Sequence, residues 1–269
     1  MNNRYLVALD LDGTLLREDK TISEKTKKVL QKVREEGHLV MISTGRPYRS
    51  SSMYYKELAL DTPIVNFNGA FVHHPSDPDW GMYHEPLSIH TAKEVIETCF
   101  NHSFNNIVAE VLDHVFMHYH DEKLLDIFMM GNPTVTTGDL RNYLQKDPTS
   151  LLIQTDAENS KKIMEITESA DASILEHSNW AAPYRFLEVV KRGVNKASGI
   201  EKVAQYYNIP QERIIAFGDE NNDLEMLAYA KYGIAMGNAI VDAKEVAYDV
   251  TRTNEEDGVA YYLEKFLLG

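Results

Sequence analysis

The sequence has little cysteine and no long hydrophobic run. Cys99 is the one cysteine among 269 residues, which excludes an internal disulfide framework. It shares a helical stripe with Val95, Ile96 and Phe100, so we interpret it as a core residue and not as a catalytic thiol. The first residues carry no basic segment followed by an apolar run, and no stretch of about 18 apolar residues occurs. We therefore expect a cytoplasmic protein with no export signal and no membrane span.

Basic residues are also scarce. The chain has 27 Lys and Arg against 41 Asp and Glu, a formal net charge of −14. Binding to a nucleic acid polymer depends on clustered cations, so this balance argues against such a partner. A small anionic partner stays compatible, because salt confines the repulsion to about 8 Å and a local pocket of basic groups or a metal ion still attracts phosphate. Nothing in the sequence indicates the oligomeric state.

The length and the pattern of elements predict an α/β protein with an insertion. A chain of 269 residues suits two domains, or one large domain carrying an inserted one. Short apolar runs alternate with amphipathic segments at both ends of the chain, which is typical of β-α units and a parallel sheet. The expected strands are 5–10, 38–44, 62–73 and 213–219, and the expected helices include 22–37, 46–58 and the last segment, 258–268.

The middle of the chain has a different pattern. We predict a helix at 88–103, an irregular region near 131–140 and a second helix at 158–170. Strands are expected at 106–112, 114–120, 151–155, 172–177 and 184–190. Strands joined by turns indicate an antiparallel sheet, so residues 84–189 are a candidate inserted α+β domain between core segments 1–83 and 190–269. His114, His118 and His120 would lie on one face of a strand, and we interpret them as a polar sheet face and not as metal ligands; a substrate-facing surface is the alternative.

The first motif with chemistry in it follows the first strand. Asp10 and Asp12 lie two residues apart, so on extended backbone both carboxylates point beyond the strand's carboxyl end, where open α/β sheets bind ligands. Such a pair can divide the roles of nucleophile and general acid/base beside a divalent cation. A polar turn is the plainer alternative. A calcium loop is excluded, because its sixth position is Leu15 instead of Gly and its twelfth is Thr21 instead of Glu.

Two further segments are compatible with phosphate binding. Thr44 and Gly45 lie where the second strand meets a helix, so a hydroxyl and free N–H groups face an anion there. An ordinary turn with a threonine cap fits that segment as well. Lys196 lies just inside a predicted helix, where its ammonium could neutralise a phosphate and keep Asp10 ionised. A solvated surface lysine is the alternative at that position.

The last motif, FGDENND, spans residues 217–223 and follows a buried strand. Asp219 lies at the strand's end, and Asp223 follows within one helical turn. Hard oxygen ligands clustered in this way suit magnesium, although Asn221, Asn222 and Asp223 could also serve as helix caps.

Together these segments resemble the haloacid dehalogenase (HAD) superfamily, and within it the Cof-type phosphatases with an α/β cap inserted between the second and third motifs. The segments ALDLDGTLL, STGR, IVNFNGA, GVNKASGI, FGDENNDLEM, GIAMGNA and EEDGVAYYLEKF follow the family's order along the whole chain. The resemblance implies a Rossmann-like core with a mostly parallel sheet, a Mg²⁺ cofactor and a small phosphorylated metabolite as substrate.

The resemblance also implies a role for each matching residue. Asp10 would be the nucleophile and Asp12 the general acid/base, with both residues contributing to the metal site. Asp219 would be the remaining direct metal ligand, and Asp223 would support the metal through hydrogen bonds or water. The phosphate would be held by Leu11 (main chain), Thr44, Gly45, Lys196 and Asn222. The central expectation is spatial: positions 10, 12, 196 and 219 gather around one cation and one phosphoryl group.

Three rival functions are compatible with parts of this pattern. A phosphomutase can share the DxDGT motif and a similar cap. A non-catalytic phospho-ligand sensor could keep the fold, although mere binding does not require a second acid at Asp12. A dinucleotide enzyme is disfavoured, because no G-x-G-x-x-G follows the first strand.

Overall fold

The computed structural model describes residues 4–156, 159, 161–164, 172–177 and 186–269. It divides into two compact units. Unit 1 comprises Met1–Gly45, Ser52–Tyr83 and Asn195–Gly269, and unit 2 comprises Arg46–Ser51 and His84–Val194. The role of residues 84–189 as a cap domain stays a prediction.

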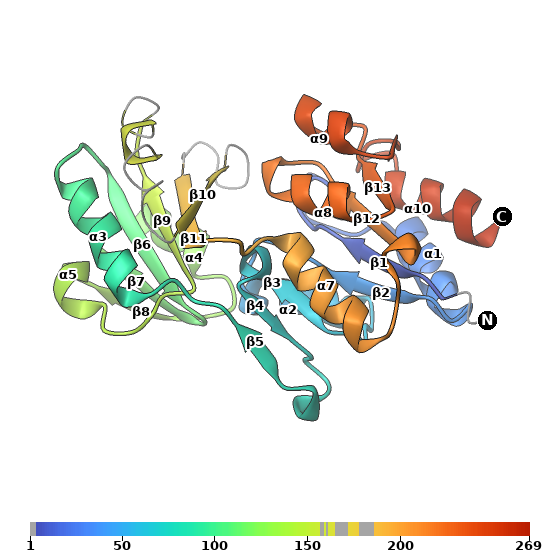
Figure 1. Ribbon diagram of the computed structural model, residues 1–269, viewed down its shortest axis with the longest axis horizontal. Helices are drawn as coiled ribbons and strands as arrows, with labels where there is room; N and C mark the ends of the chain where they lie inside the picture. The colour runs from blue at the N-terminus through green and yellow to red at the C-terminus, as the bar shows by residue number, and fades with distance from the viewer. Residues whose placement is uncertain (1–3, 157–158, 160, 165–171, 178–185) are drawn as a thin grey trace. The chain divides into compact units, whose positions relative to one another are not determined.

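Unit 1 is built on a parallel sheet, and all of its strand pairs run in the same direction. The strand order is β14-β13-β12-β1-β2, so β1 lies between β2 and β12 (Figure 1). The strands are β1 (Leu6–Leu9), β2 (Leu39–Ile42), β12 (Ile214–Gly218), β13 (Tyr232–Ala235) and β14 (Asp249–Val250). The carboxyl ends of β2, β1 and β12 are therefore neighbours, and each is followed by one of the predicted motifs.

Helices cover this sheet. Leu6 and Ala8 of β1 share one core cluster with Ile200 and Val203 of α7 (Lys196–Tyr206) and with Met226 of α8 (Leu224–Tyr229). The alternate residues of β1 point to the opposite face. Helix α1 (Glu24–Glu35) packs against β2 and against α10 (Gly258–Leu263). The remaining elements of this sheet region are η3 (Gln211–Arg213), η4 (Asn221–Asp223), α9 (Val241–Val246) and a terminal π-helix (Glu264–Leu268).

A small second sheet continues from the end of β2. Its order is β3-β4-β5, with β3 (Ile64–Asn66) antiparallel to β4 (Phe71–His73) and β5 at Met82–His84. Two short 3-10 helices, η1 (Phe67–Gly69) and η2 (Pro78–Trp80), lie between these strands. Helix α2 (Tyr48–Glu57) begins in unit 2 and ends in unit 1.

Unit 2 contains a six-stranded sheet in the order β10-β11-β9-β6-β7-β8 (Figure 1). Its strands are β6 (Asn106–Val111), β7 (His114–Met117), β8 (Thr134–Thr137), β9 (Ser150–Gln154), β10 (Ala172–His177) and β11 (Phe186–Lys191), and its helices are α3 (Ile89–Phe100), α4 (Glu122–Phe128) and α5 (Leu140–Tyr143). The pairs are antiparallel except β7 with β8, which is parallel.

Two details differ from the sequence-based expectation for this unit. The region near 131–140 is less irregular than predicted, because β8 forms there and extends the sheet beside β7. A helix connects β7 to β8, which is what a parallel pairing requires. Most of the predicted helix at 158–170 lies outside the described residues.

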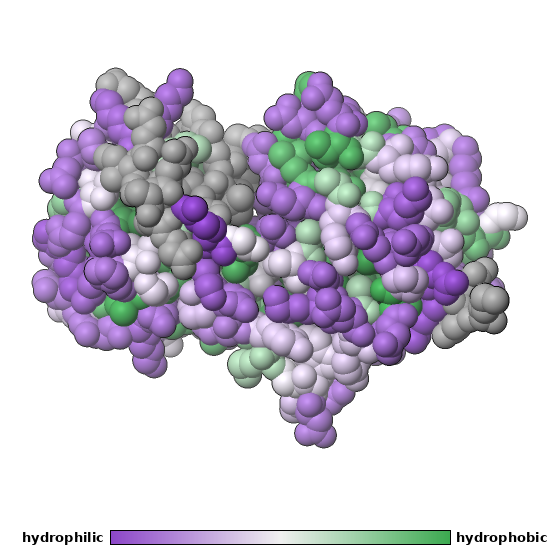
Figure 2. Space-filling model, in the orientation of Figure 1, coloured by the Kyte–Doolittle hydropathy of each residue, from purple (hydrophilic) through white to green (hydrophobic). Residues whose placement is uncertain are grey.

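Cys99 lies in the core of the described chain, and hydrophilic residues lie on its surface. Cys99 is fully buried beside Val95 and Ile96, and burial raises the pKa of its thiol to about 12, so the interpretation as a core residue is confirmed. Hydrophilic residues predominate on the face of the molecule shown in Figure 2. Among the described residues, no helix is both long and apolar enough to span a bilayer.

Candidate active site

Asp10 lies at the carboxyl end of β1 and is buried. Its backbone N–H donates to the carbonyl of Phe217, which ties this residue to β12 (3.1 Å). One side-chain oxygen, Oδ1, accepts a hydrogen bond from Lys196 Nζ at 2.6 Å. Burial is the main influence on this carboxyl, with Lys196 acting against it and Asp223 with it, and together they raise the pKa of Asp10 to about 7.

Lys196 is the first residue of α7 and is fully buried, so the alternative of a solvated surface lysine is wrong. The helix start is fixed by a capping box in which Asn195 and Ser198 exchange side-chain and backbone hydrogen bonds. The ammonium bridges two carboxylates, Asp10 Oδ1 and Asp223 Oδ1, at 2.6 Å each. Burial lowers the pKa of Lys196, but the two carboxylates raise it by more, so the net shift is upward.

Asp219 and Asp223 follow β12 and are both buried. Asp219 Oδ1 accepts from the Thr14 hydroxyl at 2.8 Å. A Cβ on Gly13, whose φ is +76°, would lie 2.1 Å from Asp219 Oδ2, so glycine at position 13 is what allows this carboxylate to approach. Asp223 Oδ2 accepts from the backbone N–H of Asp219 at 2.8 Å and of Glu220 at 3.0 Å, which holds the turn that carries Asp219.

The three carboxylates form a candidate cation site. Ligand oxygens of Asp10, Asp219 and Asp223 lie within 4.8 Å of one another, the one such group of acidic, histidine or cysteine side chains in the described part of the chain. When all are ionised, the ammonium of Lys196 leaves two negative charges uncompensated. Burial, aided by Asp223 and Asp10, raises the pKa of Asp219 to about 8. The surplus charge and the hard oxygen donors fit a divalent cation such as Mg²⁺.

Asp12 lies apart from that group of carboxylates. Its Oδ1 accepts from Lys20 Nζ at 2.8 Å, and its side chain is partly exposed. Its charge still contributes to raising the pKa of Asp10, so the two acids are within electrostatic reach of each other. The structure thus brings positions 10, 196, 219 and 223 together and places the Asp12 carboxylate beside a surface lysine.

The residues predicted to hold phosphate surround the ends of β1 and β2. Thr44 is buried, and its N–H donates to the carbonyl of Val65 at 2.9 Å. Leu11 is also buried, and its carbonyl accepts from Thr14 and Leu16, which closes the loop after β1. Asn222 Nδ2 donates to Asn68 Oδ1 at 2.9 Å, and a Cβ on Gly45 would lie 3.5 Å from that Nδ2. Gly45, Asn68 and Asn222 are therefore neighbours.

Sequence reasoning missed Thr14 and Asn68 as parts of this site. Thr14 lies inside the DLDGT motif but received no role. Asn68 precedes Gly69, and an Asn-Gly pair is a turn signal, which could have marked it as a residue with unusual backbone geometry.

Among the described residues, no histidines of unit 2 form a group that could hold a metal ion. His114 Nε2 lies 2.9 Å from Thr136 Oγ1 on the neighbouring strand. His118 is buried, and its Nδ1 accepts from the backbone N–H of Leu140 at 3.2 Å. His118 is thus a structural residue of the interior, which corrects the expectation of a polar sheet face, whereas His120 is exposed.

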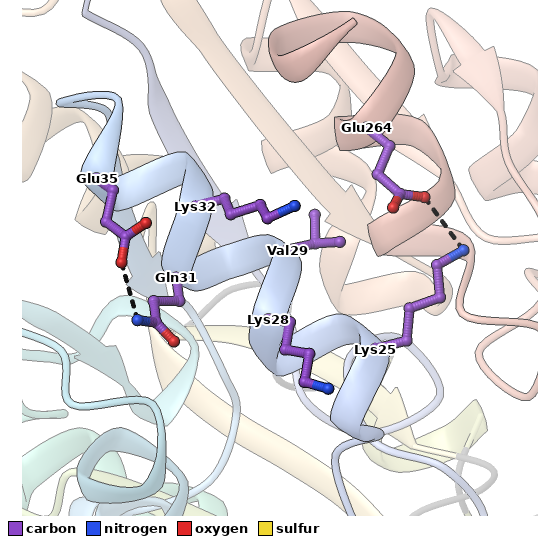
Figure 3. Close-up of a pocket in the computed structure, with 7 residues that line it drawn as sticks. All are labelled: Lys25, Lys28, Val29, Gln31, Lys32, Glu35 and Glu264. Carbon is purple, nitrogen blue, oxygen red and sulfur yellow. Dashed lines mark hydrogen bonds and ion pairs between the residues drawn. The ribbon is translucent and has the colours of Figure 1, made fainter.

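A separate surface hollow lies along α1 and contains none of the predicted site residues. It is lined by Lys25, Lys28, Val29, Gln31, Lys32, Glu35 and Glu264 (Figure 3). Lys25 pairs with Glu264 at 3.1 Å, and Gln31 donates to Glu35 at 2.8 Å. These are ordinary surface contacts, and the hollow holds no group of carboxylates like that of Asp10, Asp219 and Asp223.

The parallel sheet, the three clustered carboxylates and the buried lysine are the arrangement that the motifs of the sequence led us to expect. The model of the haloacid dehalogenase-like hydrolase family matches residues 7–263, so the chain belongs to that family. The resemblance seen in the motifs is confirmed, and the protein is an enzyme, a phosphatase acting on a small phosphorylated substrate.

Particular relatives narrow the comparison. The chain is 53% identical over 262 residues to 5-amino-6-(5-phospho-D-ribitylamino)uracil phosphatase YitU of Bacillus subtilis (strain 168), covering 97% of each chain. It is 30% identical over 287 residues to the B. subtilis phosphatase YwtE, which acts on the same compound, covering 98% of each chain. Among solved structures, TM0651 from Thermotoga maritima is similar with a TM-score of 0.79 and 27% identity, covering 98% of this chain and 97% of that one.

Proposed function

We propose that this phosphatase hydrolyses a phosphate monoester in a Mg²⁺-dependent reaction, through an aspartyl-phosphate on Asp10. One observation carries the proposal: Lys196 holds Oδ1 of the buried Asp10 at 2.6 Å, while Asp219 and Asp223 converge on the same point. The lysine orients the carboxylate and leaves Oδ2 to act as the nucleophile.

The chemistry has two steps. In the first, Asp10 Oδ2 attacks phosphorus, the bond from phosphorus to the ester oxygen breaks, and Asp12 gives its proton to the departing alcohol. In the second, water attacks phosphorus, Asp12 takes the proton of that water, and phosphate leaves with Asp10 restored. Mg²⁺ bound by Asp10, Asp219 and the main chain at Asp12, with Asp223 in support, would offset the charge on the phosphoryl oxygens.

The neighbouring groups position the phosphate. The proposed contacts are Lys196, the Thr44 hydroxyl, the Asn222 amide, and N–H groups of Leu11 and Gly45. Asp12 distinguishes the proposal from a mere binding site, because holding a phosphate does not require a second acid. We further propose that unit 2 acts as the cap that excludes water from the reaction.

We propose that the substrate is 5-amino-6-(5-phospho-D-ribitylamino)uracil, the compound that appears in the names of the relatives YitU and YwtE. The support is the 53% identity to YitU over 97% of both chains. The same compound is named for YwtE at 30% identity. Its phosphate ester of a sugar alcohol is a small phosphorylated metabolite of the class expected from the motifs.

The test is a phosphate-release assay over 5-amino-6-(5-phospho-D-ribitylamino)uracil, sugar phosphates and nucleotides, each with Mg²⁺ and with a chelator. We expect the first compound to have the highest kcat/KM, and the chelator to abolish release. Asp10→Asn should remove turnover while leaving the protein folded by circular dichroism. Appreciable hydrolysis by that variant would contradict the covalent route. An isomeric phosphate ester as product would indicate a mutase, and binding without any turnover would indicate a sensor.

A further inference from the structure

The turn between β3 and β4 has an unusual backbone at the edge of the proposed phosphate site. Phe67, Asn68 and Gly69 have φ values of 49°, 51° and 101°, so three successive residues are left-handed. Phe67 and Asn68 are both almost completely buried. Residues other than glycine adopt this conformation at an energetic cost, and such turns persist where surrounding contacts hold them, often at functional sites.

The contacts of this turn lead to the proposed phosphate ligands. The N–H of Asn68 donates to the carbonyl of Thr44 at 3.1 Å. A Cβ on Gly69 would lie 2.2 Å from the carbonyl oxygen of Asn195, so the turn packs directly on the residue that caps the helix of Lys196. A Cβ on Gly45 would lie 3.1 Å from Asn68 Oδ1 and 3.2 Å from Asn68 Nδ2.

The contact between the side chains of Asn68 and Asn222 has a defined direction. Asn222 Nδ2 donates to Asn68 Oδ1 at 2.9 Å. A carboxamide can present either its oxygen or its NH₂ group, and an anionic phosphate accepts hydrogen bonds only. Because Asn68 Oδ1 accepts an N–H of Asn222, the NH₂ group of Asn222 faces Asn68 and Gly45, and the amide oxygen of Asn222 does not. The second N–H of that amide is then left for a phosphate oxygen.

We propose that Asn68 is a positioning residue for phosphate: its Oδ1 fixes the Asn222 amide with the NH₂ group toward the substrate. The inference rests on the proposed function of Asn222 as a phosphate ligand. Burial supports the direction of control, because Asn68 is held inside a tight turn whereas Asn222 is only partly buried. Asparagine also suits position 68 because it tolerates a positive φ better than most residues while supplying an amide oxygen.

The test is a double-mutant cycle of Asn68→Gly and Asn222→Ala. Glycine adopts the left-handed conformation freely, so N68G removes the side chain without forcing the turn to change. Each single variant should lower kcat/KM by roughly 10- to 100-fold and weaken inhibition by inorganic phosphate similarly, as loss of a hydrogen bond to a charged group does. The double variant should be no worse than N222A, because Asn68 acts through Asn222.

Asn208→Gly is the matched control. Asn208 also has a positive φ, 54°, but is exposed and belongs to the turn after α7. It should leave both kcat/KM and phosphate inhibition at the wild-type value. The Mg²⁺ concentration for half activation should be unchanged in N68G, which separates a phosphate effect from general damage to the site.

Two results would overturn the inference. One is wild-type behaviour of N68G, and the other is a double variant whose loss is the product of the two single losses. If N68G melts below the assay temperature, the cycle is repeated below its melting temperature with the same criterion. Calorimetric binding of inorganic phosphate to the Mg²⁺-loaded variants tests the inference even if no substrate is turned over, so its failure is distinguishable from failure of the proposed function.

Discussion

Two sets of buried charges in this molecule are satisfied differently. In unit 2, Glu110 and Arg49 form an almost fully buried ion pair, and the guanidinium also donates to the carbonyl of Leu112 at 3.2 Å. In unit 1, one ammonium, that of Lys196, is shared by Asp10 and Asp223. Asp219 lies beside them with a neutral donor, the hydroxyl of Thr14.

The difference separates a structural ion pair from a binding site. Burial raises the pKa of Glu110, Arg49 works directly against that shift, and Glu188 and Asp113 add smaller upward contributions. In unit 1, burial together with repulsion from the neighbouring carboxylates raises the pKa of Asp10 to about 7 and that of Asp219 to about 8. A fold gains nothing from such repulsion, so the surplus of negative charge supports the proposal that a cation binds there.

Removing the shared ammonium should have the largest effect. Lys196→Met leaves three buried carboxylates without a cation and removes a proposed phosphate ligand. We expect kcat/KM to fall by at least roughly 10³-fold and the free energy of unfolding without metal to fall by about 3–5 kcal/mol. Steady-state kinetics and urea unfolding measure the two effects. Lys32→Met, an exposed lysine on α1, is the control and should change neither.

Neutralising a buried acid should lower the free energy of unfolding in unit 2 and raise it in unit 1. Glu110→Gln removes the carboxylate that pairs with the buried Arg49, so we expect a loss of about 3–5 kcal/mol in the free energy of unfolding. Asp219→Asn relieves repulsion, so at pH 8.5 without metal we expect a gain of about 1 kcal/mol, seen as a rise of roughly 2–4 °C in Tm. Mg²⁺ should raise the Tm of the Glu110 variant and leave that of the Asp219 variant unchanged. If both variants were less stable than the wild type, the expected difference between the paired Glu110 and the repelled Asp219 would be contradicted.

The pH dependence of metal binding sharpens the same comparison. Because the pKa values of Asp10 and Asp219 are raised above the ordinary 3.8, the folded protein without metal binds more protons than the unfolded chain between about pH 4 and 8. Their contribution to stability is therefore present at acid pH and lost as pH rises through that window. Mg²⁺ competes with those protons, so its apparent affinity should rise by up to about tenfold per pH unit for each proton displaced.

Calorimetric titrations of Mg²⁺ at pH 5.5, 6.5 and 7.5 measure this trend. The Asp219→Asn variant is the control and should show no Mg²⁺ binding at any of the three pH values, since it lacks a proposed metal ligand. An apparent affinity that does not change over this range would mean that the acids are already ionised without metal.

The sequence predicted those parts of the site that depend on local pattern. Asp10, Thr44 and Asp219 each end or follow an apolar run, and parallel strands align their carboxyl ends, so their meeting followed from topology. Burial of Lys196 did not, because it depends on Asp10 and Asp223 at distant positions in the chain. The Asn-Gly pair could indicate a turn at Asn68, but its side-chain contact could not be predicted, because that contact is with Asn222, far away in the chain. In unit 2, the parallel pairing of β8 also depends on a non-local partner, β7.

The smallest effect is expected from replacing Lys20, the partner of the Asp12 carboxylate, which lies outside the buried group. Lys20 is about half exposed, and exposed ion pairs contribute about 0–1 kcal/mol. Lys20→Met should therefore change kcat by less than about fivefold and leave the Mg²⁺ affinity unaltered, since neither Asp219 nor Asp223 touches this lysine. Steady-state kinetics at low and high salt measure it, and screening should shrink any difference between wild type and variant. A loss as large as that of Lys196→Met would mean that Lys20 belongs to the charged cluster, and it would contradict the separation of the Asp12–Lys20 pair from the buried carboxylates.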